Sequence, residues 1–152
     1  MIKPLSYIDE EARIAALLRY RDLDYSDATE FQTITELAAD LCNVPIALIS
    51  FVDTSDVILH FVSGLEGASC IPRNISFCHY TVKGAEPFEI EDASLDSRFK
   101  SNPLVTDDPK FRFYTGMPIV THDGLSIGAI CVLDYKPNKL DTLQIRSLIR
   151  LS

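Results

Sequence analysis

Apolar residues recur every three or four positions in three stretches of the chain, and this spacing predicts amphipathic helices. The stretches are Ile8–Tyr20, Thr29–Cys42 and Asp141–Leu151. Asn43 suits a left-handed helix end, and Pro45 prevents the second helix from continuing. Asp141 and Gln144 have the spacing of a helix start. We therefore expect two helices at the beginning of the chain and one at its end.

Short apolar runs between turn residues predict strands. The run Ile46–Val52 is almost unbroken, which is typical of a strand covered on both faces. Further strands are expected at Val57–Ser63, Phe88–Glu91, Phe111–Val120 and Leu125–Asp134. His122-Asp123-Gly124 joins the last two strands as a hairpin. Because side chains alternate along a strand, Val57, Leu59 and Phe61 are expected on one face.

The segments between these strands are polar and rich in turn residues. They predict a loop from Gly64 to about Asn74, a short helix over Ser76–Lys83, and helical turns near Leu95–Phe99 and Pro103–Thr106. The consecutive hairpins indicate a single α/β (α+β) domain over residues 1–152, with a largely antiparallel sheet covered by the terminal helices. The last helix has no glycine stop, so we expect the domain to be a fragment of a longer signalling protein with a linked output domain.

Composition and charge limit the classes of partner that this chain is expected to bind. Apolar residues make up 47% and charged residues 24% of the chain, which fits a folded domain with a core. The formal net charge is −8 and the basic residues are scattered, which argues against nucleic acid as a partner. The sequence holds no apolar run near the roughly 20 residues of a membrane span, and its beginning is too acidic for a secretory signal. We expect a cytoplasmic domain without membrane contact.

The chemical motifs of enzymes are missing from the sequence. Cys42, Cys70, Cys78 and Cys131 stand far apart, so we expect reduced, non-catalytic thiols, with Cys70 in its loop the most reactive. The sequence contains neither of the glycine-rich phosphate-binding motifs GxxxxGK[ST] and GxGxxG. Its three histidines lack the spacing of metal ligands. We therefore predict no catalytic residue and no metal site.

Five segments in a fixed order carry a family resemblance: Pro72–Cys78, Glu91–Phe99, Asn102–Val105, Phe111–Pro118 and Asp123–Asp134. Together they resemble the GAF domain attached to bacterial sensor histidine kinases and diguanylate cyclases. The resemblance covers nearly the whole chain. It implies a central antiparallel sheet of five or six strands with the terminal helices on one face, where such domains often form homodimers. Loops and short helices roof a pocket on the other face.

This resemblance implies a regulatory domain that senses a small molecule and relays the signal. The ligand would lie beneath Ile71–Lys83 and Asp92–Val105. The candidate ligand-binding residues are Arg73, Phe77, Cys78, Asp92, Phe99, Phe113, Tyr114 and Cys131. Aromatic walls and one arginine favour a small metabolite with a ring or an acid group. The alternative is that the aromatic side chains only pack together.

Three other functions are compatible with the same family. A ligand-free dimerisation scaffold would fill its pocket with its own side chains, so a cavity of about 300 Å³ or more would argue against it. Free methionine-(R)-sulfoxide reductases are GAF-like, and Cys70 with Cys78 is faintly similar to their cysteines, but the third member of their set is missing. Cys78-His79 is similar to the bilin-attachment pair of phytochromes without the accompanying Asp-Ile-Pro stretch. Neither bilin nor haem is expected, and the ligand stays unidentified.

Overall fold

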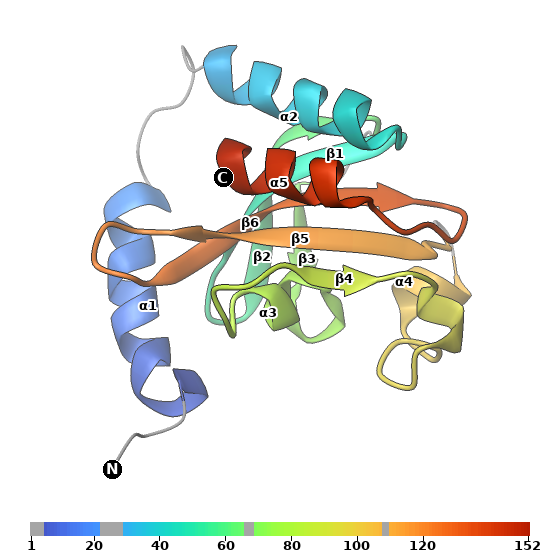
Figure 1. Cartoon of the computed structure of the whole chain (residues 1–152). Helices are drawn as coiled ribbons and strands as arrows, with labels where there is room; N and C mark the ends of the chain where they lie inside the picture. Colours follow the sequence, from blue (N-terminus) through green and yellow to red (C-terminus); the bar gives the residue numbers. More distant parts are fainter. Residues whose placement is uncertain (1–4, 22–28, 66–68, 108–109) are drawn as a thin grey trace.

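The computed structural model describes residues 5–21, 29–65, 69–107 and 110–152, and it is organised around one sheet (Figure 1). The six strands are antiparallel and lie in the order β3-β2-β1-β6-β5-β4. Their bounds are β1 Ile46–Val52, β2 Asp56–Ser63, β3 Cys70–Pro72, β4 Phe88–Ile90, β5 Phe113–Val120 and β6 Ser126–Asp134. This sheet confirms the predicted fold class.

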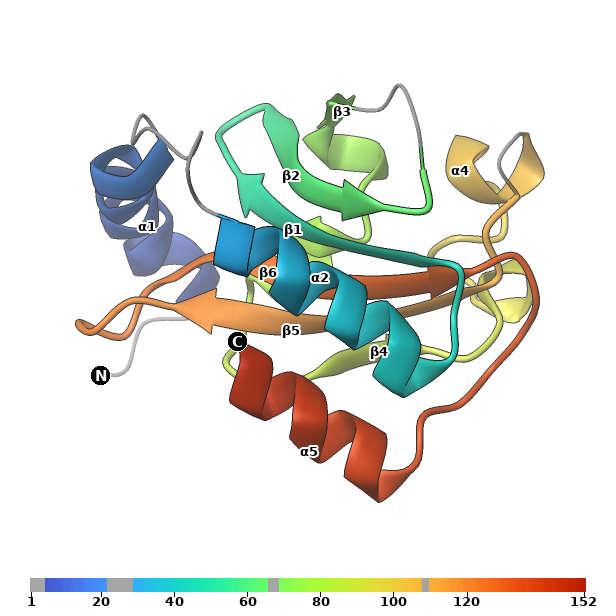
Figure 2. The ribbon, with the colours of Figure 1, turned by 90° about the horizontal axis from the view of Figure 1, so that it is seen from above.

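Helices α2 (Thr29–Cys42) and α5 (Thr142–Leu151) lie side by side over one face of the sheet (Figure 2). Asn43 ends α2 with a φ of 54°, as the sequence predicts. Asp141 caps α5 in a capping box: its side chain accepts a hydrogen bond from the Gln144 amide, and its own amide donates to the Gln144 side chain. The Gln144 Nε2 also donates to the carbonyl of Leu41, at 3.1 Å, and so joins the two helices.

Helix α1 (Leu5–Arg21) lies apart from that pair, across the end of β1 and β6 near the β5–β6 turn (Figures 1 and 2). Leu17 is fully buried there against Phe51 and Ile127. Arg19 forms an ion pair with Asp123 of the turn, at 3.0 Å. Helix α1 thus covers the end of the sheet, while α2 and α5 cover its face.

Four short helical segments roof the opposite face: η1 Arg73–Ile75, α3 Cys78–Thr81, η2 Ala93–Leu95 and α4 Pro103–Thr106. Asp92 accepts a hydrogen bond from the Ser94 amide, at 3.0 Å, and so caps η2. Asn102 caps α4 and donates to the carbonyl of Ile75, at 2.9 Å. The bond from Asn102 joins α4 to η1. We use the word roof for these four segments.

Two local predictions were wrong. Strand β3 lies inside the predicted loop, where its three residues pair with the edge strand β2 and are too short to show an alternating pattern. In β2, Leu59 faces the roof, but Phe61 lies on the helix side, with its ring 5.3 Å from that of Phe31. A register shift between β1 and β2 and a left-handed φ of 50° at Phe61 turn this side chain over.

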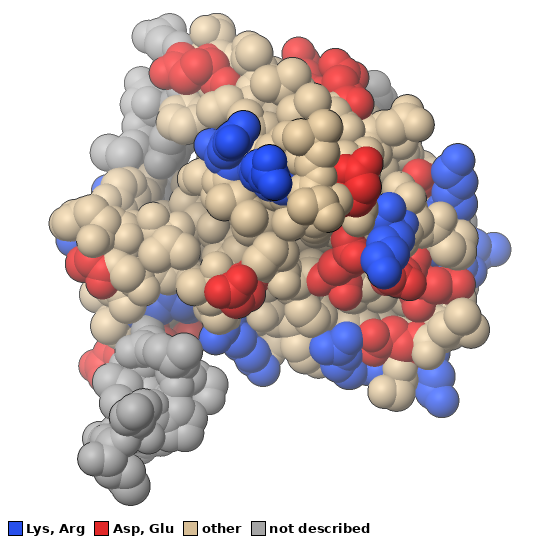
Figure 3. All heavy atoms as spheres, viewed as in Figure 1, with Lys and Arg blue, Asp and Glu red and all other residues tan. Residues whose placement is uncertain are grey.

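The surface mixes charges of both signs. On the face in Figure 3, acidic and basic side chains are interspersed, and a broad uncharged surface lies among them. Among the described helices, none has the length and apolar character needed to cross a membrane.

Candidate functional site

A cavity of about 380 Å³ lies between the roof and the sheet. Its walls come from β1, β2, β3, β5, β6, the roof and the segments that flank them. Its size exceeds the roughly 300 Å³ at which ligand pockets begin. The lining residues are Leu48, Leu59, Leu65, Ile71, Ser76, Phe77, Cys78, Leu104, Phe111, Tyr114, Cys131 and Leu133. We call this space the roof cavity. The roof is therefore not collapsed onto the sheet.

A small polar cluster interrupts these apolar walls. The Tyr114 hydroxyl lies 3.2 Å from the Cys131 Sγ and 3.5 Å from the Cys78 Sγ, to which it donates. The same hydroxyl shares a hydrogen bond of 2.7 Å with the Thr81 hydroxyl. The Ser50 hydroxyl donates to the Cys78 Sγ at 3.3 Å. Two thiols and three hydroxyls thus form one hydrogen-bonded group.

Burial and hydrogen bonding shift the pKa values of the titratable groups in this cluster in different directions. The hydrogen bond with the Cys131 thiol has the largest effect on Cys78 and lowers its pKa. Hydrogen bonds from the hydroxyls of Ser50 and Tyr114 act in the same direction, and together these bonds exceed the opposite effect of burial and bring the pKa of Cys78 to about 6. Burial raises the pKa of Cys131, and the adjoining Cys78 raises it further. Burial also raises the pKa of Tyr114, which keeps its hydroxyl protonated as a donor. Titratable groups with such displaced pKa values are typical of functional sites.

Gly116 makes room for the tyrosine. A Cβ atom at this position would lie 2.2 Å from the Tyr114 hydroxyl oxygen and 2.6 Å from the Thr81 Oγ1. Gly116 also pairs with Cys131 across the β5–β6 ladder. The absence of a side chain therefore lets Tyr114 fold back over its own strand and reach the thiols.

The structure brings together four of the residues predicted from sequence. Phe77, Cys78, Tyr114 and Cys131 all line the roof cavity. Phe99 is buried behind Phe77, with ring centroids 4.9 Å apart, and is not among the lining residues. The aromatic side chains therefore do both things that the sequence left open: some pack together, and some line a cavity.

Phe113 was placed on the wrong face of the sheet. It is fully buried in the helix-side core with Met117 and Leu148. The reason is the alternation of side chains along β5, which sends Phe113 and the adjacent Tyr114 to opposite faces.

Arg73 also lies outside the roof cavity. Its guanidinium contacts the carboxylate of Glu10 in α1, and its Nε donates to the Nδ1 of His79 at 3.0 Å. Arg73 and Glu10 line an outer cleft of about 470 Å³ together with Arg13, whose guanidinium also donates to Glu10. The anion partner expected inside the pocket is thus engaged elsewhere. Asp92 serves as the cap of η2.

The sequence analysis missed most of the apolar lining. Leu133 and Leu48 could have been found, because they share a sheet face with Cys131 by strand alternation and pairing. Leu65 comes from an irregular segment and Leu104 from the four-residue helix α4, and neither is long enough to show a periodic pattern.

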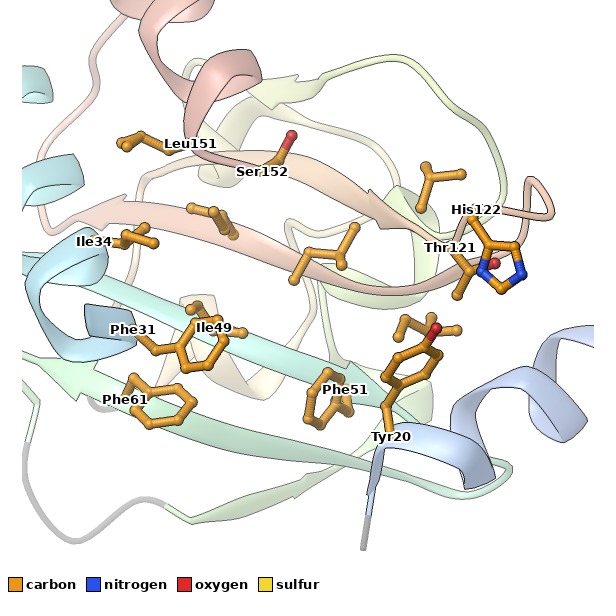
Figure 4. A pocket seen from close by; sticks show the side chains of 14 residues that line it. Tyr20, Phe31, Ile34, Ile49, Phe51, Phe61, Thr121, His122, Leu151 and Ser152 are labelled. Carbon is orange, nitrogen blue, oxygen red and sulfur yellow. The ribbon is translucent and has the colours of Figure 1, made fainter. Parts of the chain in front are cut away.

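A second apolar pocket, of about 340 Å³, lies on the helix side of the sheet (Figure 4). Phe31, Phe51 and Phe61 point into it, and Tyr20 of α1 and Leu151 of α5 lie at its ends. We prefer the roof cavity as the candidate site, because the cluster of buried groups with displaced pKa values lies there.

Comparison with known proteins identifies the family of this chain. Residues 28–151 match the family model of the GAF domain. The chain is 38% identical over 129 residues to the cyclic di-GMP phosphodiesterase PA2567 of Pseudomonas aeruginosa, a match that covers 85% of this chain and 22% of that protein. The chain thus spans about a fifth of this relative.

Solved structures share the same fold at low sequence identity. The GAF domain of a phosphoenolpyruvate-protein phosphotransferase from Coxiella burnetii superimposes with a TM-score of 0.66 at 12% identity, covering 95% of this chain and 88% of the other. A domain of a putative two-component sensor histidine kinase from Sinorhizobium meliloti gives a TM-score of 0.61 at 13% identity, covering 84% of this chain and 87% of the other.

Proposed function

Because this chain belongs to the GAF domain family, whose members are generally regulatory, we propose that it senses a small molecule in the roof cavity and relays the signal to a linked output domain. The parent would be a bacterial signalling protein, such as a cyclic-di-GMP enzyme or a sensor kinase, acting in the cytoplasm. The similarity to a cyclic di-GMP phosphodiesterase and to a sensor kinase domain supports this context.

The observation that carries the proposal is the roof cavity itself. A scaffold domain would fill this space with its own side chains, whereas about 380 Å³ is left between the roof and the sheet. The lining is apolar except for the cluster around Tyr114, and the guanidinium of Arg73 is held outside by Glu10. These features favour a neutral, largely apolar ligand with one polar group over an acid.

Two connections support signal relay from this cavity. Cys131 in the cavity floor belongs to β6, and residues 135–141 lead from the end of β6 into helix α5. In the roof, Arg73 joins η1 to Glu10 of helix α1. A ligand that moves the roof against the sheet would therefore act on both helices at the ends of the domain.

Binding can be tested with indole and para-cresol, which combine an apolar ring with one polar group. The measurement is an amide NMR titration of the wild type and of two variants that each add bulk to one pocket. Leu59→Phe narrows the roof cavity, and Ile34→Phe narrows the helix-side pocket. We expect the ligands to shift the amide signals of Phe77, Cys78 and Cys131.

The matched variants decide where the ligands bind. Leu59→Phe should abolish the shifts, and Ile34→Phe should leave them unchanged. Shifts that survive Leu59→Phe, or that centre on Phe31 and Phe61, would contradict binding in the roof cavity.

A homodimer is a second proposed property, and exposed apolar residues on the helices support it. Leu37 and Leu41 of α2 are 43% and 42% exposed, and Leu143 of α5 is 65% exposed. The two helices pack against each other, so these exposed side chains belong to neighbouring helices.

A further inference from the structure

Cys78 and Cys131 form a pair of buried thiols whose Sγ atoms are 3.4 Å apart, although 53 residues separate them in the sequence. A disulfide bond joins sulfur atoms at about 2.0 Å, so a closure of about 1.4 Å would bring this pair to bonding distance. Both side chains line the roof cavity. A small displacement would thus allow the pair to bond, and the pair adjoins a space that a small reagent can occupy.

The two cysteines belong to elements of different rigidity. Cys131 is fully buried in β6, which pairs with β1 on one side and with β5 on the other. Cys78 begins α3, a helix of four residues in the roof, and is 5% exposed. The roof element can therefore move toward the strand without disturbing the sheet ladder.

Cys78 also has the electrostatic surroundings of a reactive thiol. Hydrogen bonds from Cys131, Ser50 and Tyr114 favour its thiolate and lower its pKa to about 6. The thiolate is the nucleophilic form of cysteine. Cys42 is a useful contrast, because it is also buried but its pKa is raised to about 11 by burial and by the charge of Asp141. Burial alone therefore does not make a thiol of this protein reactive.

We propose that Cys78 and Cys131 form a reversible disulfide when hydrogen peroxide enters the roof cavity. The Cys78 thiolate attacks one peroxide oxygen, the O–O bond breaks, and hydroxide leaves to become water with the proton that the thiol had released. The product is a sulfenic acid on Cys78. Cys131 then attacks the Cys78 sulfur, the S–O bond breaks, and the hydroxide that leaves takes the Cys131 proton. Overall, two thiols and one peroxide give one disulfide and two waters.

This bond ties the roof to the floor of the cavity. It links α3 to β6 directly, and it removes the thiol hydrogen bonds that hold the Tyr114 hydroxyl in place. A dithiol reductant reverses the reaction by exchange through a mixed disulfide. The oxidation state of the pair therefore sets the size of the cavity and the coupling of roof to sheet.

The test exposes the whole chain to hydrogen peroxide, alkylates the remaining thiols in denaturant, and maps the peptides by mass spectrometry. The wild type should yield a cross-linked peptide pair that contains Cys78 and Cys131 and that disappears after reduction. Loss of free Cys78 should be about tenfold faster, or more, than loss of free Cys42, the matched buried thiol. In a Cys131→Ala variant, the sulfenic acid of Cys78 should accumulate and be trapped by dimedone.

Two results would overturn the proposal. One is that Cys78 and Cys131 stay alkylatable while Cys70, the exposed thiol, is consumed. The other is a peroxide-dependent disulfide that joins a different pair in the wild type. The peptide map of the wild type needs no variant, so the proposal remains testable even if Cys131→Ala does not fold.

Discussion

Arg73 and Glu10 join the roof to the first helix, although 63 residues separate them in the sequence. The guanidinium of Arg73 donates to both carboxylate oxygens of Glu10. The distance from its Nη2 to the Glu10 Oε2 is 3.2 Å. The same guanidinium donates to the carbonyl of Asp53 in the β1–β2 turn, at 3.2 Å. One side chain therefore connects α1, the sheet and the roof. Arginine suits this position because its planar group donates in several directions at once.

Removing Arg73 should destabilise the domain more than removing an exposed arginine. We expect Arg73→Ala to lower the free energy of unfolding by about 1–3 kcal/mol, because several charge-assisted hydrogen bonds are lost from a largely buried group. Arg19→Ala is the matched control. Arg19 lies in α1 and also forms a long-range ion pair, with Asp123, but both of these side chains are over 40% exposed. Its cost should stay below about 1 kcal/mol. Equal costs in urea denaturation would contradict the connecting role of Arg73.

The Glu10 carboxylate should make stability depend on acid pH. The hydrogen bond from Arg73, with help from Arg13, lowers the pKa of Glu10 from 4.5 to about 2. A carboxyl whose pKa is lower in the folded state stabilises the fold above its unfolded pKa and loses that contribution as the pH falls toward its folded pKa. The stability difference between wild type and Glu10→Gln should therefore be constant at neutral pH and shrink between pH 4.5 and about pH 2. A difference that does not change over this interval would exclude an ionised Glu10 as its source.

Thiol titration should find one fast cysteine in the native protein. Cys70 is the exposed thiol, whereas Cys42, Cys78 and Cys131 are buried. A bulky disulfide reagent such as Ellman's reagent should react quickly with Cys70 alone, because the other sulfur atoms are out of its reach despite the lowered pKa of Cys78. Cys70→Ser should remove the fast phase, and unfolding should expose the other thiols. A fast phase that persists in Cys70→Ser would show that the roof opens widely.

A charge on the helix layer should weaken self-association. If the exposed apolar residues of α2 and α5 form a dimer interface, Leu143→Glu should raise the dissociation constant measured by sedimentation about tenfold or more. Leu95→Glu is the control, because Leu95 is 82% exposed but lies in η2 of the roof. A monomeric wild type at high concentration, or equal effects of both substitutions, would remove the proposed interface.

Much of the fold follows from patterns in the sequence. Helix α2 begins and ends at the residues that the apolar spacing and Asn43 indicate, and α5 begins after the predicted Asp141 cap. The central strand Ile46–Val52 is buried along its whole length, as its nearly unbroken apolar run predicts. Helix ends depend on residues that are close together in the sequence, and the burial of a strand is reflected in its own run of apolar residues. A local pattern in the sequence can therefore predict these features.

Patterns in the sequence therefore predicted the main helices and strands, their order and the segments that surround a cavity, but not strand β3. Which side chains enter that cavity depends on long-range packing. Alternation along β5 sends the adjacent residues Phe113 and Tyr114 to opposite faces, but only the placement of α2 and α5 decides that Phe113 faces the helices and Tyr114 faces the thiols. Arg73 is a roof residue whose direction depends on the carboxylate of Glu10, which approaches from a distant helix. Cys78 and Cys131 become a pair because the roof folds back over β6. Each of these outcomes depends on contacts between segments far apart in the chain, and a local pattern of apolar residues does not specify which distant segments meet.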